Sequence, residues 1–571
     1  MATYYPLKGT SPPPSETVAV DGPVIRHIGF SDLLDALRLG WEDFKAVPSH
    51  AIVLCVIYPI IGILLWRMVL GYSVLPMLVP IAAGFALIGP FAALGLYELS
   101  YRRELGMDAS AWHAFRVLRA PSFGSMLGLG GVLLAIFIAW VVTAHAIYVS
   151  TFGDTIALRF QDRRWSYRGL GAAVDRVVHR LRGLGLAPGD RVAAYGVNSD
   201  AYLVLFLACA QAGVVHVPVN FALKGNELAY ILEDSGARLL VADNALAPLV
   251  REVLDEGRAA GVEAVLPMFP GSGTGEQSLL ETAEGRGPGS GPGEGPGTGP
   301  AEADLLQLLY TSGTTSAPKG AMMTHRALMA EYVSSVIALD LTAEDRPLVA
   351  MPLYHSAAMH VFLLPYLSLG ATVRLLAKPD VPEILRHVED EHIGSLFLAP
   401  TVWVPLSNHP ALDTRDLSSL TKAQYGASIM PVTVLQRLRS RFPKLGFYNC
   451  FGQSELGPLC TVLRPEEHHA RPASCGRPVY FVEARVVTAE GRVADPGEPG
   501  EIQYRSPQLM DGYWNKPEAT AEAFSEGWFR SGDQVTRDEQ GYIQVVDRIK
   551  DVINTGGVME APREVEDCNN E

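Results

Sequence analysis

A ten-residue stretch of small and hydroxyl-bearing side chains is the strongest chemical signal in the sequence. Residues 311–320 read Thr-Ser-Gly-Thr-Thr-Ser-Ala-Pro-Lys-Gly and follow the apolar run 305–310, which predicts a buried strand. Small residues let backbone N–H groups face an anion, and a lysine adds positive charge. The pattern predicts a phosphate cradle unlike the G-x-x-x-x-G-K-[ST] loop, with a polar surface turn as the alternative. Its candidate ligands are Thr311, Ser312, Gly313, Thr314, Thr315 and Lys319.

Further motifs occur in a fixed order on both sides of this stretch. They are Arg164–Tyr167, Gly426–Ser428, Asn449–Glu455, Gly500–Ile502, Gly512–Trp514, Trp528–Asp533, Asp538–Tyr542 and Asp547–Ile553. Together they resemble the adenylate-forming superfamily, which includes acyl-CoA synthetases, firefly luciferase and the adenylation domains of peptide synthetases. The family string is Y-T-S-G-T-T-G-x-P-K-G, and Ser316 replaces its second-last glycine. The resemblance covers about residues 151–567 and implies a large α/β domain of stacked subdomains.

The resemblance implies roles for individual residues in activating a carboxylic acid with ATP and then forming an acyl-CoA. Lys319 and its hydroxyl neighbours would hold the β- and γ-phosphates, and Ser454 would contact the α-phosphate. Glu455 matches the residue that holds Mg²⁺, a hard cation suited to oxygen ligands. The other implied positions are the adenine loop Gly426, Ala427 and Ser428, the adenine-facing Phe451 with Gly452, the ribose contacts Asp533 and Arg548, and the hinge Lys550.

The segment Met351–Ser356 bears on the substrate. It resembles the segment beside the acyl pocket of acyl-CoA and aryl-CoA ligases, and no acidic residue lies between 349 and 369 to pair with an amino group. An amino-acid substrate is therefore disfavoured. Flanking apolar runs suit a fatty acyl tail of undetermined length, although they suit any buried strand equally. His355 either gates the pocket or orients the carboxylate, or it is a hydrogen-bonded core histidine.

The first 149 residues have a different composition. Three apolar segments, Ala51–Leu70, Val74–Tyr97 and Ser125–Val149, each reach about the 20 residues that cross a bilayer. We therefore predict an all-α membrane region of about three transmembrane helices. The segment Asp32–Ala46 has apolar residues at helical spacing, which is typical of a helix on the membrane surface.

Two segments of this region, Gly84–Phe91 and Gly95–Ser100, resemble an uncharacterised bacterial integral-membrane family over about residues 25–149. The resemblance implies a multi-pass protein of the bacterial inner membrane in contact with the lipid bilayer. Arginines between the second and third apolar segments favour a cytoplasmic loop there. A third crossing would then export the synthetase region, which needs cytosolic ATP and coenzyme A, unless Ser125–Val149 does not cross.

The predicted domain order is a tail (1–30), the transmembrane region (31–149), the synthetase domain (150–548) and the start of a truncated carboxy-terminal lid (549–571). A glycine- and proline-rich loop at 271–303 is expected to be disordered. In the family the lid supplies a lysine that bridges the carboxylate and the α-phosphate, and no matching P-K-x-x-x-G-K-like motif follows residue 550. The sequence thus leaves three hypotheses. They are an acyl-CoA synthetase with activity in doubt, a catalytically impaired nucleotide- or acyl-binding fragment, and a membrane protein of unknown function fused to a non-functional synthetase fragment.

Charge and cysteine content exclude two classes of function. Residues 1–150 hold nine basic and nine acidic side chains, so the net charge of −15 belongs to residues 151–571. An acidic region without a basic cluster argues against nucleic-acid binding. The six cysteines occur singly, without a C-x-x-C pair, which argues against a cysteine metal site or a disulfide framework.

Overall fold

The computed structural model divides the chain into two units, Met1–Val149 and Ser150–Glu571. The structure describes residues 29–46, 101–108, 123–152, 155–271, 277–285, 299–311, 317–428, 430–548, 553–554 and 559–560.

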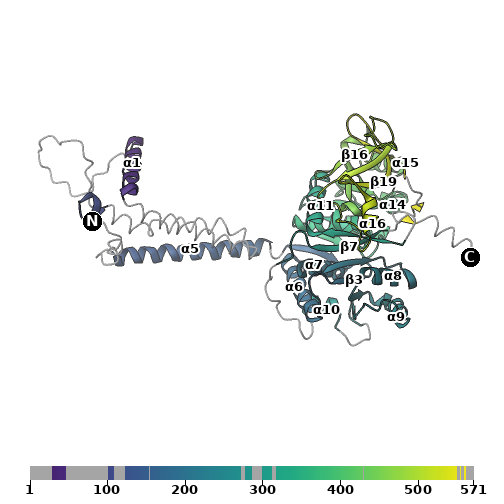
Figure 1. The fold of residues 1–571 in the computed structure, drawn as a ribbon, viewed down its shortest axis with the longest axis horizontal. Coiled ribbons are helices and arrows are strands. Elements are labelled where there is room, and N and C mark those ends of the chain that lie inside the picture. The colour runs from purple at the N-terminus through teal and green to yellow at the C-terminus, as the bar shows by residue number, and fades with distance from the viewer. Residues whose placement is uncertain are drawn as a thin grey trace, which may run out of the picture. The chain divides into compact units, whose positions relative to one another are not determined.

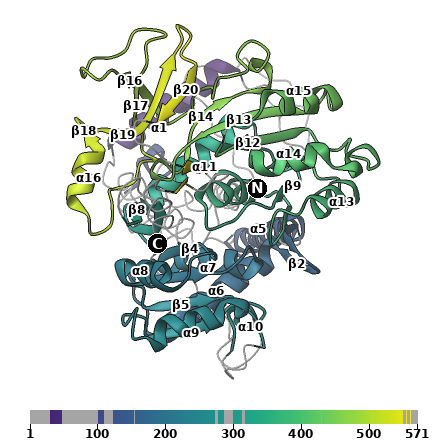
Figure 2. The same ribbon diagram turned by 90° about the vertical axis from the view of Figure 1, so that its right-hand side faces the viewer.

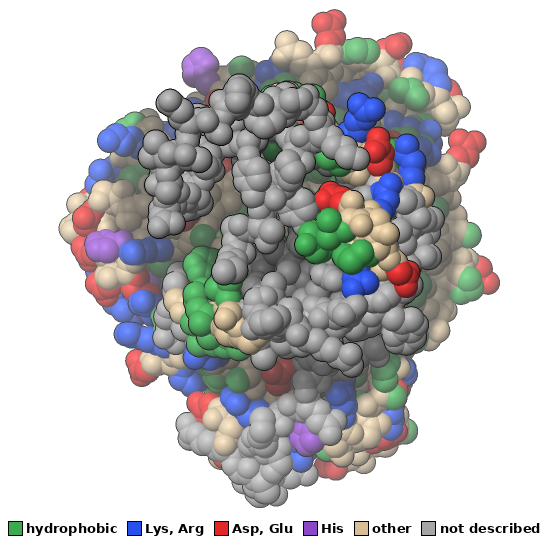
Figure 3. All heavy atoms as spheres, turned by 90° about the vertical axis from the view of Figure 1, so that its left-hand side faces the viewer, with side chains coloured by type: hydrophobic (Ala, Val, Ile, Leu, Met, Phe, Trp, Pro, Cys, Tyr) green, Lys and Arg blue, Asp and Glu red, His purple; other side chains and the backbone are tan. Residues whose placement is uncertain are grey.

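The first unit contains two described helices, α1 (Phe30–Ala46) and α5 (Phe123–Phe152). Helix α1 begins two residues before the predicted surface helix, and α5 contains the third predicted span. Both helices expose large apolar side chains, and exposed apolar groups are visible in the view of Figure 3. The exposed apolar residues are Phe30, Leu33, Leu34, Leu37, Leu39 and Trp41 on α1, and Leu129, Val132, Ile136, Ile138, Trp140 and Val142 on α5.

The prediction of about three transmembrane helices is not supported by the structure. The first two predicted spans, Ala51–Leu70 and Val74–Tyr97, lie outside the described residues. Among the residues that are described, no helix has the combined length and apolar character required for a membrane crossing.

The second unit is built from three main sheets (Figures 1 and 2). In Figure 2 the strands of the first sheet, with β4 and β5 labelled, lie low in the view, and the other two sheets lie above them, the third at the left and the second toward the right. The first has the strand order β6-β5-β3-β4-β7-β8 and is parallel except for β8. Its strands are β3 (Arg191–Tyr195), β4 (Val215–Val219), β5 (Leu239–Ala242), β6 (Ala264–Pro267), β7 (Leu305–Thr311) and β8 (Lys319–Thr324). The helices that follow or precede them are α6 (Tyr167–Gly183), α7 (Asp200–Ala212), α8 (Gly225–Ser235), α9 (Ala247–Asp255), α10 (Leu279–Ala283) and α11 (His325–Ala338).

Both faces of this sheet are buried, as expected for parallel strands with nearly continuous apolar sequence. Along β3, Val192 and Ala194 belong to the core that includes α6 and α7, whereas Ala193 and Tyr195 belong to the core that includes α8 and α9. Strand β7 matches the strand predicted over 305–310. The α/β class predicted from the sequence is confirmed.

The second sheet has nine strands in the order β15-β14-β13-β12-β11-β9-β10-β1-β2. Neighbouring strands from β13 to β1 are parallel, and both edges are antiparallel. The strands are β1 (Ile156–Phe160), β2 (Arg163–Ser166), β9 (Pro347–Val349), β10 (Val373–Leu375), β11 (Ser395–Phe397), β12 (Lys422–Gly426), β13 (Gly446–Gly452), β14 (Leu459–Leu463) and β15 (Arg477–Pro478). The helices here are the π-helix η4 (Ala357–Leu363), α12 (Leu364–Ser368), α13 (Val381–Glu391), α14 (Pro400–Asn408) and α15 (Val432–Arg441), with short 3₁₀ turns η5 (Pro410–Asp413), η6 (Ser454–Leu456) and η7 (Pro465–Glu467).

The third sheet is antiparallel, with the order β16-β17-β19-β18 and β20 paired to β19. Its elements are β16 (Glu483–Val487), β17 (Gly500–Arg505), α16 (Pro517–Ala523), β18 (Phe524–Ser525), β19 (Trp528–Arg537) and β20 (Ile543–Arg548). Near the end of the chain β21 (Ile553–Asn554) pairs with β22 (Met559–Glu560).

Part of the predicted disordered loop 271–303 is a helix, which corrects that prediction for residues 277–285. Ser278 and Glu281 form a capping box at the start of α10, because each side chain accepts a hydrogen bond from the backbone of the other. Leu279 and Leu280 are buried in the core that includes α6 and α7. The high glycine and proline content of residues 271–303 favoured a prediction of disorder and gave no sign of this short helix.

A chain of buried polar side chains crosses the core between the first sheet and α11. The Nε2 of Gln307 on β7 lies 3.0 Å from the Nδ1 of His216, and its Oε1 lies 2.7 Å from the Nε2 of His360. The other ring nitrogen of His360 lies 3.0 Å from the Tyr332 hydroxyl. Burial lowers the pKa of both histidines to about 3, so both are neutral at ordinary pH.

Candidate active site

The described ends of the predicted phosphate cradle lie on β7 and β8. Thr311 at the end of β7 and Lys319 at the start of β8 face each other in the antiparallel register. Residues 312–316, which include Ser312, Gly313, Thr314 and Thr315, lie outside the described residues. The half-buried Lys319 places its Nζ 5.3 Å from the centroid of the Tyr513 ring. Both described ends of the cradle therefore contact other motifs.

Glu455 is the point at which three distant segments meet. It lies in η6, directly after β13, and is only 7 % exposed. Its Oε1 accepts hydrogen bonds from Thr311 Oγ1 at 3.0 Å and from the Tyr513 hydroxyl at 3.1 Å. Among the residues that the structure describes, its Oε2 has one long contact, 3.5 Å from the side-chain amide nitrogen of Gln453. One carboxylate oxygen is thus fixed by hydroxyl groups, and the other is only weakly engaged.

Ser454 contacts a residue to which the sequence assigned no role. Its Oγ lies 2.8 Å from the Oγ of Ser356, which is buried at the start of η4. In the sequence, Ser356 is only the last residue of the substrate segment, and its neighbours give no sign that it belongs to the site. The contact joins that segment to the nucleotide motif.

The segment that precedes Ser356 is held by Asn198, a buried residue between β3 and α7. Its side-chain amide donates to the carbonyl oxygen of Met351 at 2.9 Å, and its Oδ1 accepts from the backbone N–H of Leu353 at 2.7 Å. Four polar contacts from a buried amide fix backbone that no regular element holds. Asn198 therefore sets the position from which His355 projects.

His355 differs from the hydrogen-bonded histidines of the core. Its ring centroid lies 4.3 Å from that of Tyr354, and burial lowers its pKa to about 4. Within the described part of the chain, no side-chain or backbone group makes a hydrogen bond to its imidazole, unlike His216 and His360. A neutral imidazole with free nitrogens can donate or accept one hydrogen bond to a ligand.

The predicted adenine loop and Phe451 lie at the carboxyl ends of two adjacent parallel strands. Gly426 ends β12 and pairs with Cys450 on β13, so close that a Cβ would collide with the Cys450 carbonyl oxygen. Ala427 follows with a φ of 65°, and Phe451 is half-buried against the core. A Cβ on Gly452 would collide with the carbonyl oxygen of Pro458. Carboxyl ends of parallel strands are where ligands bind in open α/β sheets.

Asp533 and Arg548 form a second group, on the third sheet. Their Cα atoms face each other across the β19–β20 pair, and Asp533 is 3 % exposed. The backbone N–H of Asp533 donates to the Ser531 hydroxyl at 3.0 Å. The predicted hinge residue Lys550 lies outside the described residues.

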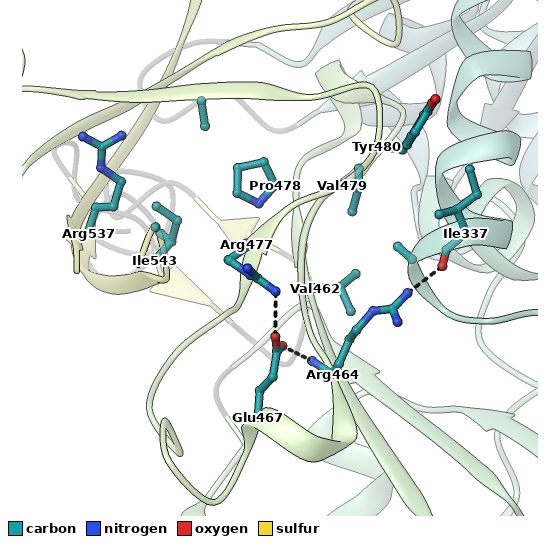
Figure 4. A pocket seen from close by; sticks show the side chains of 13 residues that line it. Ile337, Val462, Arg464, Glu467, Arg477, Pro478, Val479, Tyr480, Arg537 and Ile543 are labelled. Atoms are coloured by element: carbon teal, nitrogen blue, oxygen red, sulfur yellow. Dashed lines mark hydrogen bonds and ion pairs between the residues drawn. The ribbon is translucent and has the colours of Figure 1, made fainter. Parts of the chain in front are cut away.

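A cavity of ≈ 490 Å³ lies elsewhere, between β14, β15 and the β19–β20 hairpin (Figure 4). Apolar side chains and three arginines, Arg464, Arg477 and Arg537, line it. Its one carboxylate, Glu467, accepts hydrogen bonds from the Arg464 backbone, from Arg477 and from the Tyr542 hydroxyl. Gly541 of the Asp538–Tyr542 motif lines this cavity, but no residue with a predicted catalytic or nucleotide-binding role does, so it is separate from the candidate active site.

The residues present fit a Mg²⁺ ion that is held mainly by a nucleotide. Among the described residues, no group of three or more His, Cys, Asp or Glu side chains is arranged to hold a metal. Mg²⁺ is usually bound through one or two carboxylates together with phosphate oxygens and water. The weakly engaged Oε2 of Glu455 could serve as one such ligand.

Comparisons with known proteins match both units. The profile of the AMP-binding enzyme family matches residues 146–514, and that of a predicted integral membrane protein family, DUF2189, matches residues 77–165. A feruloyl-CoA synthase from Amycolatopsis is 38% identical over 410 residues, which cover 72% of this chain and 79% of the relative. The medium/long-chain-fatty-acid–CoA ligase FadD8 of Mycobacterium tuberculosis is 31% identical over 413 residues, 71% of each chain. The inhibitor-bound N-terminal domain of FACL13 from M. tuberculosis superimposes with a TM-score of 0.64 at 26% identity, over 70% of this chain and 97% of that domain.

Proposed function

Because this chain belongs to the AMP-binding enzyme family, we propose that it activates a carboxylic acid with ATP and then transfers the acyl group to coenzyme A. CoA ligases of this family use ATP, Mg²⁺ and coenzyme A. In the first step a carboxylate oxygen attacks the α-phosphorus and pyrophosphate leaves. In the second step the coenzyme A sulfur attacks the acyl carbon and AMP leaves.

The observation that carries this proposal is the meeting of Thr311 and Tyr513 at Glu455, directly after Ser454 in the sequence. Thr311 lies 144 residues from Glu455 in the sequence, yet their side chains share a hydrogen bond. Phosphoryl chemistry of this kind requires positioned donors and charge neutralisation more than covalent groups. A cradle lysine, two adjacent serine hydroxyls and a buried carboxylate supply these requirements.

Each residue of this group has a part in the proposed reaction. Lys319 neutralises phosphate charge at the cradle, and the Ser454 and Ser356 hydroxyls donate to the nucleotide or the carboxylate. Glu455 Oε2 would hold Mg²⁺, which when bound neutralises negative charge on the phosphates. Asp533 and Arg548 bind the ribose, where a buried carboxylate can accept from both hydroxyls.

The acyl substrate is a carboxylic acid with an apolar body. The sequence favoured a fatty acid, and a fatty-acid ligase is among the relatives. An aromatic acid is the second candidate, because the relative named a feruloyl-CoA synthase is 38% identical to this chain. The neutral His355 beside Tyr354 suits either class, since it can make one hydrogen bond to the substrate carboxylate without adding charge.

Acid-dependent ATP–pyrophosphate exchange by the full-length chain tests this function. We expect the exchange rate with one of the three acids ferulate, octanoate and palmitate to exceed the rates with the other two by about 10-fold or more, because pocket shape discriminates substrates. The Asp533→Ala variant should weaken ATP binding by about 10- to 100-fold, because a hydrogen bond to a charged group is lost. The exposed Asp413→Ala is its control. Exchange that never depends on an added acid would contradict the proposed function.

We further propose that the first unit attaches the enzyme to a lipid bilayer as a multi-pass region. The matching profile of predicted integral membrane proteins and the exposed apolar side chains of α5 support this. The full-length chain expressed in bacteria should stay in the membrane pellet after an alkaline carbonate wash, because apolar burial in lipid is insensitive to pH and salt. A truncation that begins at residue 150 is the comparison, and recovery of the full-length chain in the supernatant would refute the attachment.

A further inference from the structure

The segment that contains Tyr513 lies along the free edge of β8 as an added strand. Tyr513 forms an antiparallel bridge with Ala321. Backbone hydrogen bonds of 2.8–2.9 Å join Met322 to Asp511 and Gly512, and join Trp514 to Gly320. Main-chain pairing of this kind fixes the register, so the side chain of Tyr513 is held at one position relative to the cradle.

Tyr513 lies between the Glu455 carboxylate and the Lys319 ammonium group of the cradle. Its hydroxyl donates to Glu455 Oε1 at 3.1 Å, and Lys319 Nζ lies 5.3 Å from its ring centroid. The hydroxyl is thus placed to donate to the carboxylate, while the ring faces a cation.

A cluster around Asp234 holds the same segment and both ends of the hairpin. Its Oδ1 pairs with Lys516 Nζ at 2.9 Å, and its Oδ2 accepts from the Tyr310 hydroxyl at 2.8 Å. The Trp514 indole donates to the Asp234 carbonyl oxygen at 3.1 Å. On the other side of the cradle, the Tyr230 hydroxyl donates to the Pro318 carbonyl oxygen at 2.9 Å. The segment that bears Tyr513 and the residues at both ends of the cradle therefore contact the same helix, α8.

We propose that Tyr513 is a positioning residue that orients the Glu455 carboxylate for a divalent cation and ties that orientation to Lys319 of the phosphate cradle. The inference rests on the proposed function. With Oε1 engaged by Tyr513 and Thr311, the carboxylate cannot rotate freely, and Oε2 is presented to the metal. Groups that hold a metal ligand in place commonly alter metal affinity by about 10- to 100-fold.

The test is Mg²⁺-dependent ATP binding to the full-length chain, measured by calorimetry over a Mg²⁺ series. Tyr513→Phe keeps the ring and removes the hydroxyl, so the Mg²⁺ concentration for half-maximal ATP binding should rise about 10-fold. Excess Mg²⁺ should restore binding, which a folding defect would not allow. Tyr504→Phe is the matched control, because it removes the hydroxyl of another fully buried phenol, which lies on β17 of the third sheet.

A second variant keeps the inference testable if Tyr513→Phe is poorly folded. Thr311→Val removes the other donor to the same oxygen and should also raise the Mg²⁺ requirement. In the double variant the effects of Tyr513→Phe and Thr311→Val on this requirement should be non-additive, because both side chains contact one oxygen. An unchanged Mg²⁺ requirement in either variant, with wild-type ATP binding intact, would overturn the role of Tyr513 and leave the proposed function standing. Failure of the wild-type chain to bind ATP at any Mg²⁺ concentration would overturn both.

Discussion

Replacing Glu455 by glutamine should lower the rate of acyl-adenylate formation by about 10²–10³-fold, since a preorganised charge at the reacting phosphates is lost. The substitution preserves volume, and the amide oxygen can still accept hydrogen bonds from Thr311 and Tyr513. The loss should therefore appear in catalysis and in the Mg²⁺ requirement, with little effect on the unfolding midpoint. Single-turnover formation of the adenylate, followed over a Mg²⁺ series, measures both.

Glu467→Gln provides the control for Glu455→Gln. Glu467 is likewise a largely buried carboxylate with hydroxyl and N–H donors, but it lines the separate cavity of Figure 4. Its replacement should lower stability without changing the Mg²⁺ dependence of the rate. If the two variants behaved alike, Glu455 would have no special role at the nucleotide.

The second large effect is a loss of folding free energy at acidic pH. The full-length chain should lose about 5 kcal/mol of folding free energy between pH 6.5 and pH 4.5 through His216 and His360. Both pKa values are lowered to about 3 by burial, whereas the unfolded histidines titrate near 6.5. The unfolded chain therefore binds protons that the folded chain refuses. This stability is fully present above pH 6.5 and is lost as the pH falls toward the folded pKa values.

Urea unfolding followed by tryptophan fluorescence at several pH values measures this loss. His360→Gln should have a shallower dependence on pH than the wild type, by about 1.4 kcal/mol per pH unit. The exposed His469→Gln should match the wild-type slope. Burial raises the pKa of Glu331, which acts in the opposite direction, so the comparison between variants isolates the histidine share. Identical slopes in all three proteins would refute the assignment.

Local patterns allowed individual elements of both units to be predicted. The apolar run 305–310 became β7 of the second unit, and the start of helix α1 in the first unit was predicted within two residues. Such predictions succeed because strand and helix periodicity are local properties of the sequence. The motif order also indicated the family, because each motif is a short string whose spacing tolerates variation in the loops between.

Contacts between side chains that lie far apart in the sequence could not be predicted. Tyr513 was noted only as part of a motif, because its hydrogen bond to Glu455 spans 58 residues and its bridge to Ala321 depends on sheet topology. The polar chain through Gln307 was also missed, since each of its members occurs singly in an apolar run and has no periodic signal. The membrane prediction relied on apolar length and on a resemblance to an integral-membrane family; a family profile of predicted integral membrane proteins matches residues 77–165, whereas no described helix meets the requirements of a membrane span.

The pairing of Ala321 with Tyr513 has a consequence for how the protein is made. Roughly 190 residues separate the two strands, which at about 5–20 residues per second corresponds to about 10–40 s of ribosomal synthesis. During that interval the nascent chain displays β8 as an unpaired edge, which is open to incorrect strand addition. Chaperone demand should therefore peak late in translation and fall once the sequence beyond Trp514 leaves the exit tunnel.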